Sequence, residues 1–115
     1  MTKPVGPYTP IIRAGDWLAV SGQVGVVDGR LVEGGLEAEL EQALANLTSL
    51  LASEGASMGD VVKTTVYLDD IDDYARMNEV YVEAFGDHRP ARSAVEVAAL
   101  PLGAKVEIDA WARLP

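Results

Sequence analysis

The stretch Val61-Val62-Lys63-Thr64-Thr65-Val66-Tyr67-Leu68 decides the fold class of this chain. Its β-branched residues and two alternating faces are typical of a β-strand. Before it, after Gly34-Gly35, a stripe of leucines recurs at helical spacing and ends at Gly55: Leu36, Leu40, Leu44, Leu47 and Leu51. After it, apolar residues recur every four positions, starting near Asp72 or Asp73 and ending at Gly86: Met77, Tyr81 and Phe85. The stretch is therefore predicted to be a strand between two amphipathic helices.

Shorter strands are predicted on both sides of this unit. Residues 11–13 and 17–21 flank a turn, 24–27 and 30–32 flank Asp28-Gly29, and 92–98 and 104–112 close the chain. Asp-Gly between apolar runs is a strong hairpin signal. The order of strands, helix, strand, helix and strands predicts an α+β fold in a single domain, residues 1–115. In this fold two helices cover one face of a mixed sheet.

The last predicted strand has one apolar and one polar face. Val106-Ile108-Ala110-Ala112 share the apolar face, whereas Trp111 lies in register with Lys105, Glu107 and Asp109. An aromatic residue among charges on an uncovered sheet face favours a subunit contact, and the alternative is a single exposed aromatic. A domain of 115 residues buries a modest fraction of its surface, which also favours association.

Composition excludes several classes of function. The net charge is −9 and the nine Lys and Arg residues are scattered singly, which disfavours nucleic-acid and anionic-membrane partners. There is no cysteine and only one histidine, His88, so thiol catalysis is excluded and a metal centre or Ser-His-Asp triad has few candidate residues. No metal is predicted. The N-terminus has no signal-peptide pattern and no apolar run is long enough to span a membrane, so we expect a cytoplasmic protein.

Four short segments carry groups suited to binding a small acid. Arg92, in Pro90-Ala91-Arg92-Ser93, lies at a strand entrance, where a guanidinium can hold a carboxylate through two parallel hydrogen bonds. Tyr8 follows Gly6-Pro7 in a rigid turn, Ser21-Gly22 ends a strand, and Glu107 lies on a polar strand face. Each also has a structural interpretation, as a solvated side chain or as a turn.

Taken in order, the segments closely resemble the RidA/YjgF family of enamine and imine deaminases over nearly the whole chain. The stretches that carry the resemblance are Gly6-Pro7-Tyr8, Val20-Ser21-Gly22-Gln23, Asp60 to Leu68, Met77-Asn78-Glu79-Val80-Tyr81, Pro90-Ala91-Arg92-Ser93, Val95-Glu96-Val97 and Val106-Glu107-Ile108. The resemblance implies a chorismate-mutase-like α+β fold, a homotrimer with active sites in clefts between neighbouring subunits, and no cofactor.

The resemblance also implies roles for individual residues. Arg92 would anchor the substrate carboxylate and Glu107 would be the general base. Further substrate-binding positions would be Tyr8, Ser21, Gly22 and Asn78. The expected reaction is hydrolysis of reactive 2-imino or enamine acids, such as 2-iminopropanoate and its enamine tautomer 2-aminoacrylate, to 2-oxo acids and ammonia.

The chain departs from the family pattern at three places. Thr9-Pro10 follows the tyrosine turn, Val24-Gly25 follows Ser-Gly-Gln, and Ala94 stands where the family often has cysteine. The first two changes leave substrate preference open. Three alternatives to the deaminase remain: a non-catalytic trimer that binds small carboxylates as a sensor or chaperone-like protein, an endoribonuclease, and a site that uses His88 as base.

Overall fold

The computed structural model describes residues 6–115 and contains a five-stranded sheet in the order β1-β2-β7-β5-β6. The strands are β1 (Ile11–Ala14), β2 (Trp17–Gln23), β5 (Val61–Leu68), β6 (Ala91–Glu96) and β7 (Val106–Arg113). β5 and β6 are parallel and the other pairs are antiparallel, so the sheet is mixed. A short hairpin of β3 (Val26–Val27) and β4 (Arg30–Leu31) follows β2.

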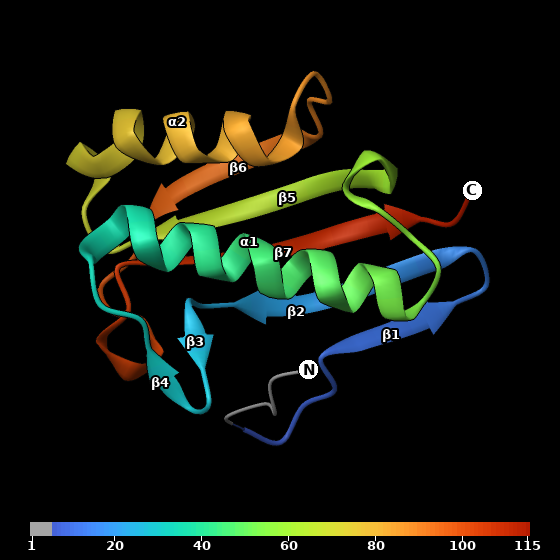
Figure 1. Cartoon of the computed structure of the whole chain (residues 1–115), viewed down its shortest axis with the longest axis horizontal. Coiled ribbons are helices and arrows are strands. Elements are labelled where there is room, and N and C mark those ends of the chain that lie inside the picture. The colour runs from blue at the N-terminus through green and yellow to red at the C-terminus, as the bar shows by residue number, and fades with distance from the viewer. Residues whose placement is uncertain (1–5) are drawn as a thin grey trace.

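Two helices, α1 (Gly35–Ser53) and α2 (Tyr74–Phe85), lie over the same face of the sheet (Figure 1). Three short 3-10 turns complete the chain: η1 (Met58–Asp60), η2 (Ile71–Asp73) and η3 (Pro101–Gly103). The predicted α+β class, the mixed sheet and its one-sided helical cover are confirmed. Within the described residues, no helix is both long and apolar enough to cross a membrane.

The core lies between the helices and the covered face of the sheet. Every leucine of the predicted α1 stripe is buried, as are Met77, Tyr81 and Phe85 of α2. The sheet contributes alternate residues: Leu18, Val20, Val66, Leu68, Val106, Ile108, Ala110 and Ala112. On β7 this alternation assigns Glu107, Asp109 and Trp111, which lie between the buried residues, to the opposite, open face.

The open face carries aromatic and charged side chains together. Trp111 is 50% exposed and Trp17 is 40% exposed on this face. The predicted register of Trp111 with Glu107 and Asp109 is confirmed, since all three alternate with the buried residues of β7. Its role as a subunit contact stays a prediction.

Several predicted boundaries were wrong by one or two residues. The last strand begins at Val106 rather than 104, because the Lys105 backbone binds residues outside the sheet: its N–H donates to the Glu39 carboxylate over 2.9 Å, and its carbonyl accepts from Asp69. β6 ends at Glu96 rather than 98. At the start of α2, Asp73 is the N-cap residue, but its side chain makes no capping hydrogen bond.

Other predicted ends also differ in detail. Before α2, the side chain of Asp70 accepts from the N–H of Asp72 and so begins the η2 turn that precedes the helix. The hairpin strands are shorter than predicted, whereas β1 and β2 extend to Ala14 and Gln23.

Gly25, one of the departures from the family pattern, lies where the hairpin packs against α1. A Cβ on this residue would lie 2.4 Å from the backbone oxygen of Glu39, so only glycine allows the hairpin to approach α1 this closely. Asn46 of α1 donates to the carbonyls of Val24 and Val26 and holds the hairpin in place. Gly25 is therefore a packing residue between the hairpin and α1.

One buried polar pair connects α2 to the sheet and yields a stability prediction. The hydroxyls of Thr64 and Tyr81 lie 2.7 Å apart, and Thr64 is fully buried. We expect Tyr81→Phe to lower the free energy of unfolding by about 1–3 kcal/mol, because it leaves the Thr64 hydroxyl buried without a partner. Adding Thr64→Val should recover much of this loss.

Urea denaturation of the two single variants and the double variant, at one fixed protein concentration, measures this coupling. Strictly additive losses in the double variant would show that the two hydroxyls contribute independently.

Candidate functional site

Arg92 is the second residue of β6 and lies on the covered face of the sheet, beneath α2. Its pairing with Thr64 in the parallel ladder places both side chains on the same side. The guanidinium carbon lies 4.8 Å from the ring centroid of Tyr81 and 5.5 Å from that of Tyr74. Nη2 donates to the Tyr74 hydroxyl over 2.9 Å, and Nη1 lies 3.7 Å from the sulfur of Met77.

The charge of Arg92 is held by aromatic rings rather than by an acid. Cation–π contacts fix a guanidinium without neutralising it. Although the chain has 18 acidic residues, Arg92 forms no ion pair with any of them within residues 6–115. The half-buried guanidinium is therefore oriented and still able to bind an anion.

Asn78 lies on the same side of α2 as the rings that contact Arg92. It is half-buried, four residues after Tyr74 and three before Tyr81, spacings that place side chains together on one helix face. Sequence reasoning missed Tyr74 and assigned Tyr81 to the core only. The signal was present in their helical spacing, but only the crossover from β5 through α2 to β6 brings them over Arg92.

Gly22 and Glu107 form a second group on the open face. A Cβ on Gly22 would lie 2.3 Å from a carboxylate oxygen of Glu107, so the glycine leaves the space that this side chain occupies. Ser21 and Gly22 sit in a β-bulge, where β2 has one more residue than β7 opposite Asp109. Bulges of this kind redirect side chains and are frequent beside active sites.

Ser21 joins this group to the Tyr8 turn. Its hydroxyl donates to the carbonyl of Thr9 over 2.7 Å, and its backbone N–H donates to the carbonyl of Pro10. Because the hydroxyl proton is used within the chain, only the oxygen of Ser21 remains to accept a hydrogen bond from a ligand. Tyr8 lies in this turn, and 42% of it is exposed.

A cavity of about 210 Å³ opens on this face next to Ser21. It is lined by Thr9, Ile12, Ala19, Val20, Ser21, Asp109, Ala110 and Trp111.

The Glu107 carboxyl has an electrostatic environment suited to accepting a proton. Burial, and then the negative charge of Asp109, raise its pKa above the ordinary carboxyl value. Asp109 in turn accepts a hydrogen bond of 2.9 Å from Tyr67, and this bond is the main cause that raises the pKa of the Tyr67 hydroxyl. A carboxylate with a raised pKa is a better general base near neutral pH.

The two groups lie on opposite faces of the sheet of a single chain. Arg92 pairs with Thr64 and Glu107 pairs with Tyr67, and these two residues of β5 are three positions apart and point to opposite sides. The fold thus brings Ser21, Gly22 and Glu107 to the open face, with Tyr8 in the adjoining turn, whereas Arg92 lies beneath α2 and Asn78 lies on that helix. Within one chain, a small molecule cannot contact Arg92 and Glu107 at once.

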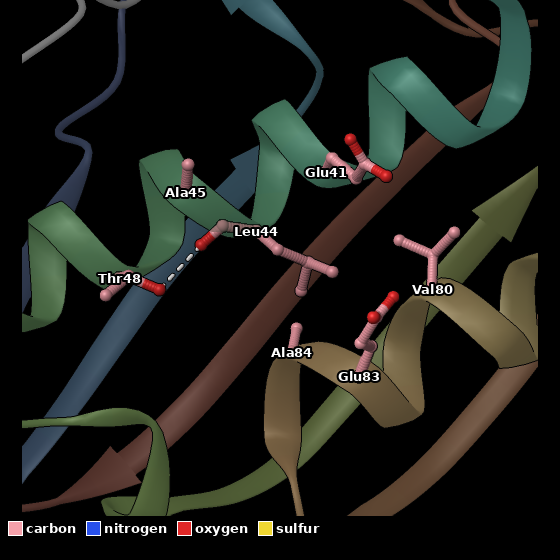
Figure 2. Close-up of a pocket in the computed structure, with 7 residues that line it drawn as sticks. All are labelled: Glu41, Leu44, Ala45, Thr48, Val80, Glu83 and Ala84. Carbon is pink, nitrogen blue, oxygen red and sulfur yellow. Dashed lines mark hydrogen bonds between the residues drawn. The ribbon is translucent and has the colours of Figure 1, made fainter.

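A larger hollow, of about 330 Å³, lies between α1 and α2 and contains none of the predicted site residues (Figure 2). It is lined by Glu41, Leu44, Ala45, Thr48, Val80, Glu83 and Ala84. Among residues 6–115, no three His, Asp or Glu side chains are grouped so that they could hold a metal ion.

Comparison with protein families agrees with the fold and with the order of these segments. A family model described as Endoribonuclease L-PSP, which is that of the RidA/YjgF family, matches residues 1–114. The chain belongs to this family. The predicted RidA/YjgF membership is therefore confirmed.

Similar proteins span several lineages. A RutC family protein of Pyrococcus horikoshii is 46% identical over 112 residues, covering 96% of this chain and 89% of that protein. The 2-iminobutanoate/2-iminopropanoate deaminase of Mus musculus is 44% identical over 110 residues, covering 94% of this chain and 82% of the mouse protein. The crystal structure of RidA from the Antarctic bacterium Psychrobacter sp. PAMC 21119 superposes with a TM-score of 0.94 at 38% identity, covering 97% and 92% of the two chains.

The raised pKa of Glu107 yields a pH-dependent stability prediction. A carboxyl whose folded pKa is raised contributes stability that is fully present below its ordinary pKa of about 4.3 and is lost as the pH rises through the folded value. Glutamine cannot ionise. We therefore expect Glu107→Gln to become more stable relative to the natural protein as the pH rises through this window.

The difference in stability is followed by measuring the thermal unfolding midpoints of the natural protein and of Glu107→Gln from about pH 4 to pH 8. A gap between the two midpoints that stays constant over this range would contradict the raised pKa.

Proposed function

We propose that this protein hydrolyses reactive 2-imino acids and their enamine tautomers to 2-oxo acids and ammonia. The observation that carries the proposal is the Arg92 guanidinium, which aromatic rings hold in place and no acid of the described chain neutralises. Such a group suits a small carboxylate. The name of the mouse relative, a 2-iminobutanoate/2-iminopropanoate deaminase, supports the same substrate class.

In the proposed mechanism, Arg92 binds the substrate carboxylate and so fixes the carbon of the C=N bond for attack. Glu107 accepts a proton from a water molecule, whose oxygen forms a bond to that carbon. The electron pair of the C=N π bond moves to nitrogen, which takes that proton from Glu107 and gives the carbinolamine. Glu107 then accepts the proton of the carbinolamine hydroxyl and passes it to nitrogen as the C–N bond breaks, so that the C=O bond of the 2-oxo acid forms and ammonia leaves. General-base assistance contributes roughly 10²–10⁴-fold, which suits a reaction that already proceeds slowly in water.

The remaining family positions complete this proposal. Tyr8, the oxygen of Ser21 and the backbone of Gly22 would contact the substrate beside Glu107, and Asn78 would contact it beside Arg92. No cofactor enters the reaction. The match of these positions to the family pattern supports the proposed roles.

The separation of Arg92 and Glu107 supports a site shared between two copies of the chain. If one substrate contacts both residues, the covered-face group of one subunit must meet the open-face group of its neighbour. The exposed Trp111 and Trp17 give the open face the apolar surface that such an association would bury. We propose a homotrimer in which each site lies between neighbouring subunits.

Replacing Arg92 tests the proposed activity. We expect Arg92→Ala to lose roughly 100-fold or more in kcat/KM for imine hydrolysis, since two charge-assisted hydrogen bonds of about 1.5–3 kcal/mol each are removed. An amino-acid oxidase generates the imines, and semicarbazide traps those that remain. The matched control is Arg89→Ala, which removes the same charge from an exposed side chain that, within residues 6–115, donates only to the carbonyls of Gly86 and His88.

Full activity of the Arg92→Ala variant would show that Arg92 does not bind the substrate carboxylate. If the natural protein accelerates no imine in the panel but binds 2-oxobutanoate, the non-catalytic carboxylate-binding trimer becomes the function.

Mixing inactive subunits tests whether the sites are shared. We expect Arg92→Ala and Glu107→Gln each to be nearly inactive, and their co-expressed mixture to recover activity. In randomly mixed trimers, about a quarter of shared sites hold both intact residues. Two different affinity tags isolate the mixed assemblies, and each variant mixed with itself is the control. No recovery in isolated mixed assemblies would contradict a site that combines Arg92 of one chain with Glu107 of another.

RNA cleavage is the second candidate, because the matching family model is described as an endoribonuclease. The net charge of −9 and the scattered cations disfavour a polyanionic substrate. Cleavage that persists after repeated purification and disappears in Arg92→Ala would favour this candidate over the deaminase.

A further inference from the structure

The hydroxyl of Tyr74 is the one polar atom besides the sulfur of Met77 that the side chain of Arg92 contacts within residues 6–115. Tyr74 is the first residue of α2, and 42% of it is exposed. The side chain is therefore placed at the surface, over the guanidinium, where an incoming anion would approach.

The direction of the hydrogen bond between Arg92 and Tyr74 follows from the two groups that form it. A guanidinium carries only donors, so the Tyr74 oxygen must accept from Nη2 of Arg92. The phenolic proton is then left to donate elsewhere, and within residues 6–115 the hydroxyl has no acceptor for it. Hydrogen bonding to a cation also polarises the hydroxyl and strengthens it as a donor.

Tyr81 provides the contrast on the same helix. Its ring lies closer to the guanidinium, at 4.8 Å, but its hydroxyl is buried against Thr64 at 2.7 Å. Tyr81 can therefore support Arg92 only through its ring. Among residues 6–115, Tyr74 alone combines a ring contact to Arg92 with a hydroxyl whose proton has no acceptor.

We propose that the Tyr74 hydroxyl is a further substrate-binding group, which donates a hydrogen bond to the carboxylate that Arg92 holds. This inference rests on the proposed function. Arg92 and Tyr74 then present adjacent donors to the two oxygens of a small 2-oxo or 2-imino acid. The weak contact of Nη1 with the Met77 sulfur is replaced by a carboxylate oxygen when the ligand binds.

The test measures binding of 2-oxobutanoate, a product-type ligand, by titration calorimetry, together with imine turnover. Tyr74→Phe keeps the ring contact and removes only the hydroxyl. We expect about a 10-fold or greater loss of affinity, the effect of losing a hydrogen bond to a charged group. In turnover, KM should rise by a similar factor while kcat changes little, because the lost bond is present in both the ground state and the transition state.

The matched control is Val82→Ala, a substitution on the same helix at a residue that is also about two-fifths exposed, two turns beyond Tyr74. It should bind 2-oxobutanoate as the natural protein does. Arg92→Ala should lose binding more severely than Tyr74→Phe. This pattern supports the proposal.

Three outcomes would overturn it, and they differ in what they leave standing. If Tyr74→Phe binds 2-oxobutanoate like the natural protein while Arg92→Ala does not, Tyr74 has no part in binding and the deaminase proposal is unaffected. If Arg92→Ala also binds normally, the carboxylate is not held at this place, and both proposals fail. A fall in kcat with unchanged KM for Tyr74→Phe would make the hydroxyl a positioning group instead.

Discussion

The crossover from β5 through α2 to β6 is the constraint on which the site depends. Parallel strands need a long connection, and here α2 is that connection, packed back onto the two strands that it joins. The parallel register sets Arg92 beside Thr64, directly under the helix. One arginine in an acidic chain is thereby placed among the aromatic residues of α2 and away from the acids of the open face.

This placement resolves an electrostatic problem. A carboxylate neighbour would hold the guanidinium firmly but would also neutralise the charge that a ligand needs. Tyr74 and Tyr81 orient the guanidinium through their rings at a modest energetic gain and leave its charge available. On the other face, burial and Asp109 raise the pKa of Glu107, so the same sheet carries an unpaired guanidinium and a carboxyl of raised pKa in two separate environments, as far as residues 6–115 show.

Sequence reasoning predicted the elements well and their connections to the site only in part. The leucine spacing of α1, the alternation of β5 and β7 and the glycines at helix ends depend on local periodicity, which is visible in the chain itself. Strand ends were less accurate, because the start of β7 is determined by Glu39, a residue 66 positions before Lys105. The roles of Tyr74 and Gly25 were missed for the same reason, since each depends on a contact with a distant segment.

By itself, the sequence determined the α+β class, the membership of the RidA/YjgF family and the residue types suited to binding a small acid. These properties follow from periodicity, composition and motif order, which depend only on the order of residues along the chain. Only the tertiary structure decided that Arg92 lies under α2 and Glu107 on the opposite face. A side chain's face depends on which strand pairs with which and in what register, and pairing is a contact between segments far apart in the sequence.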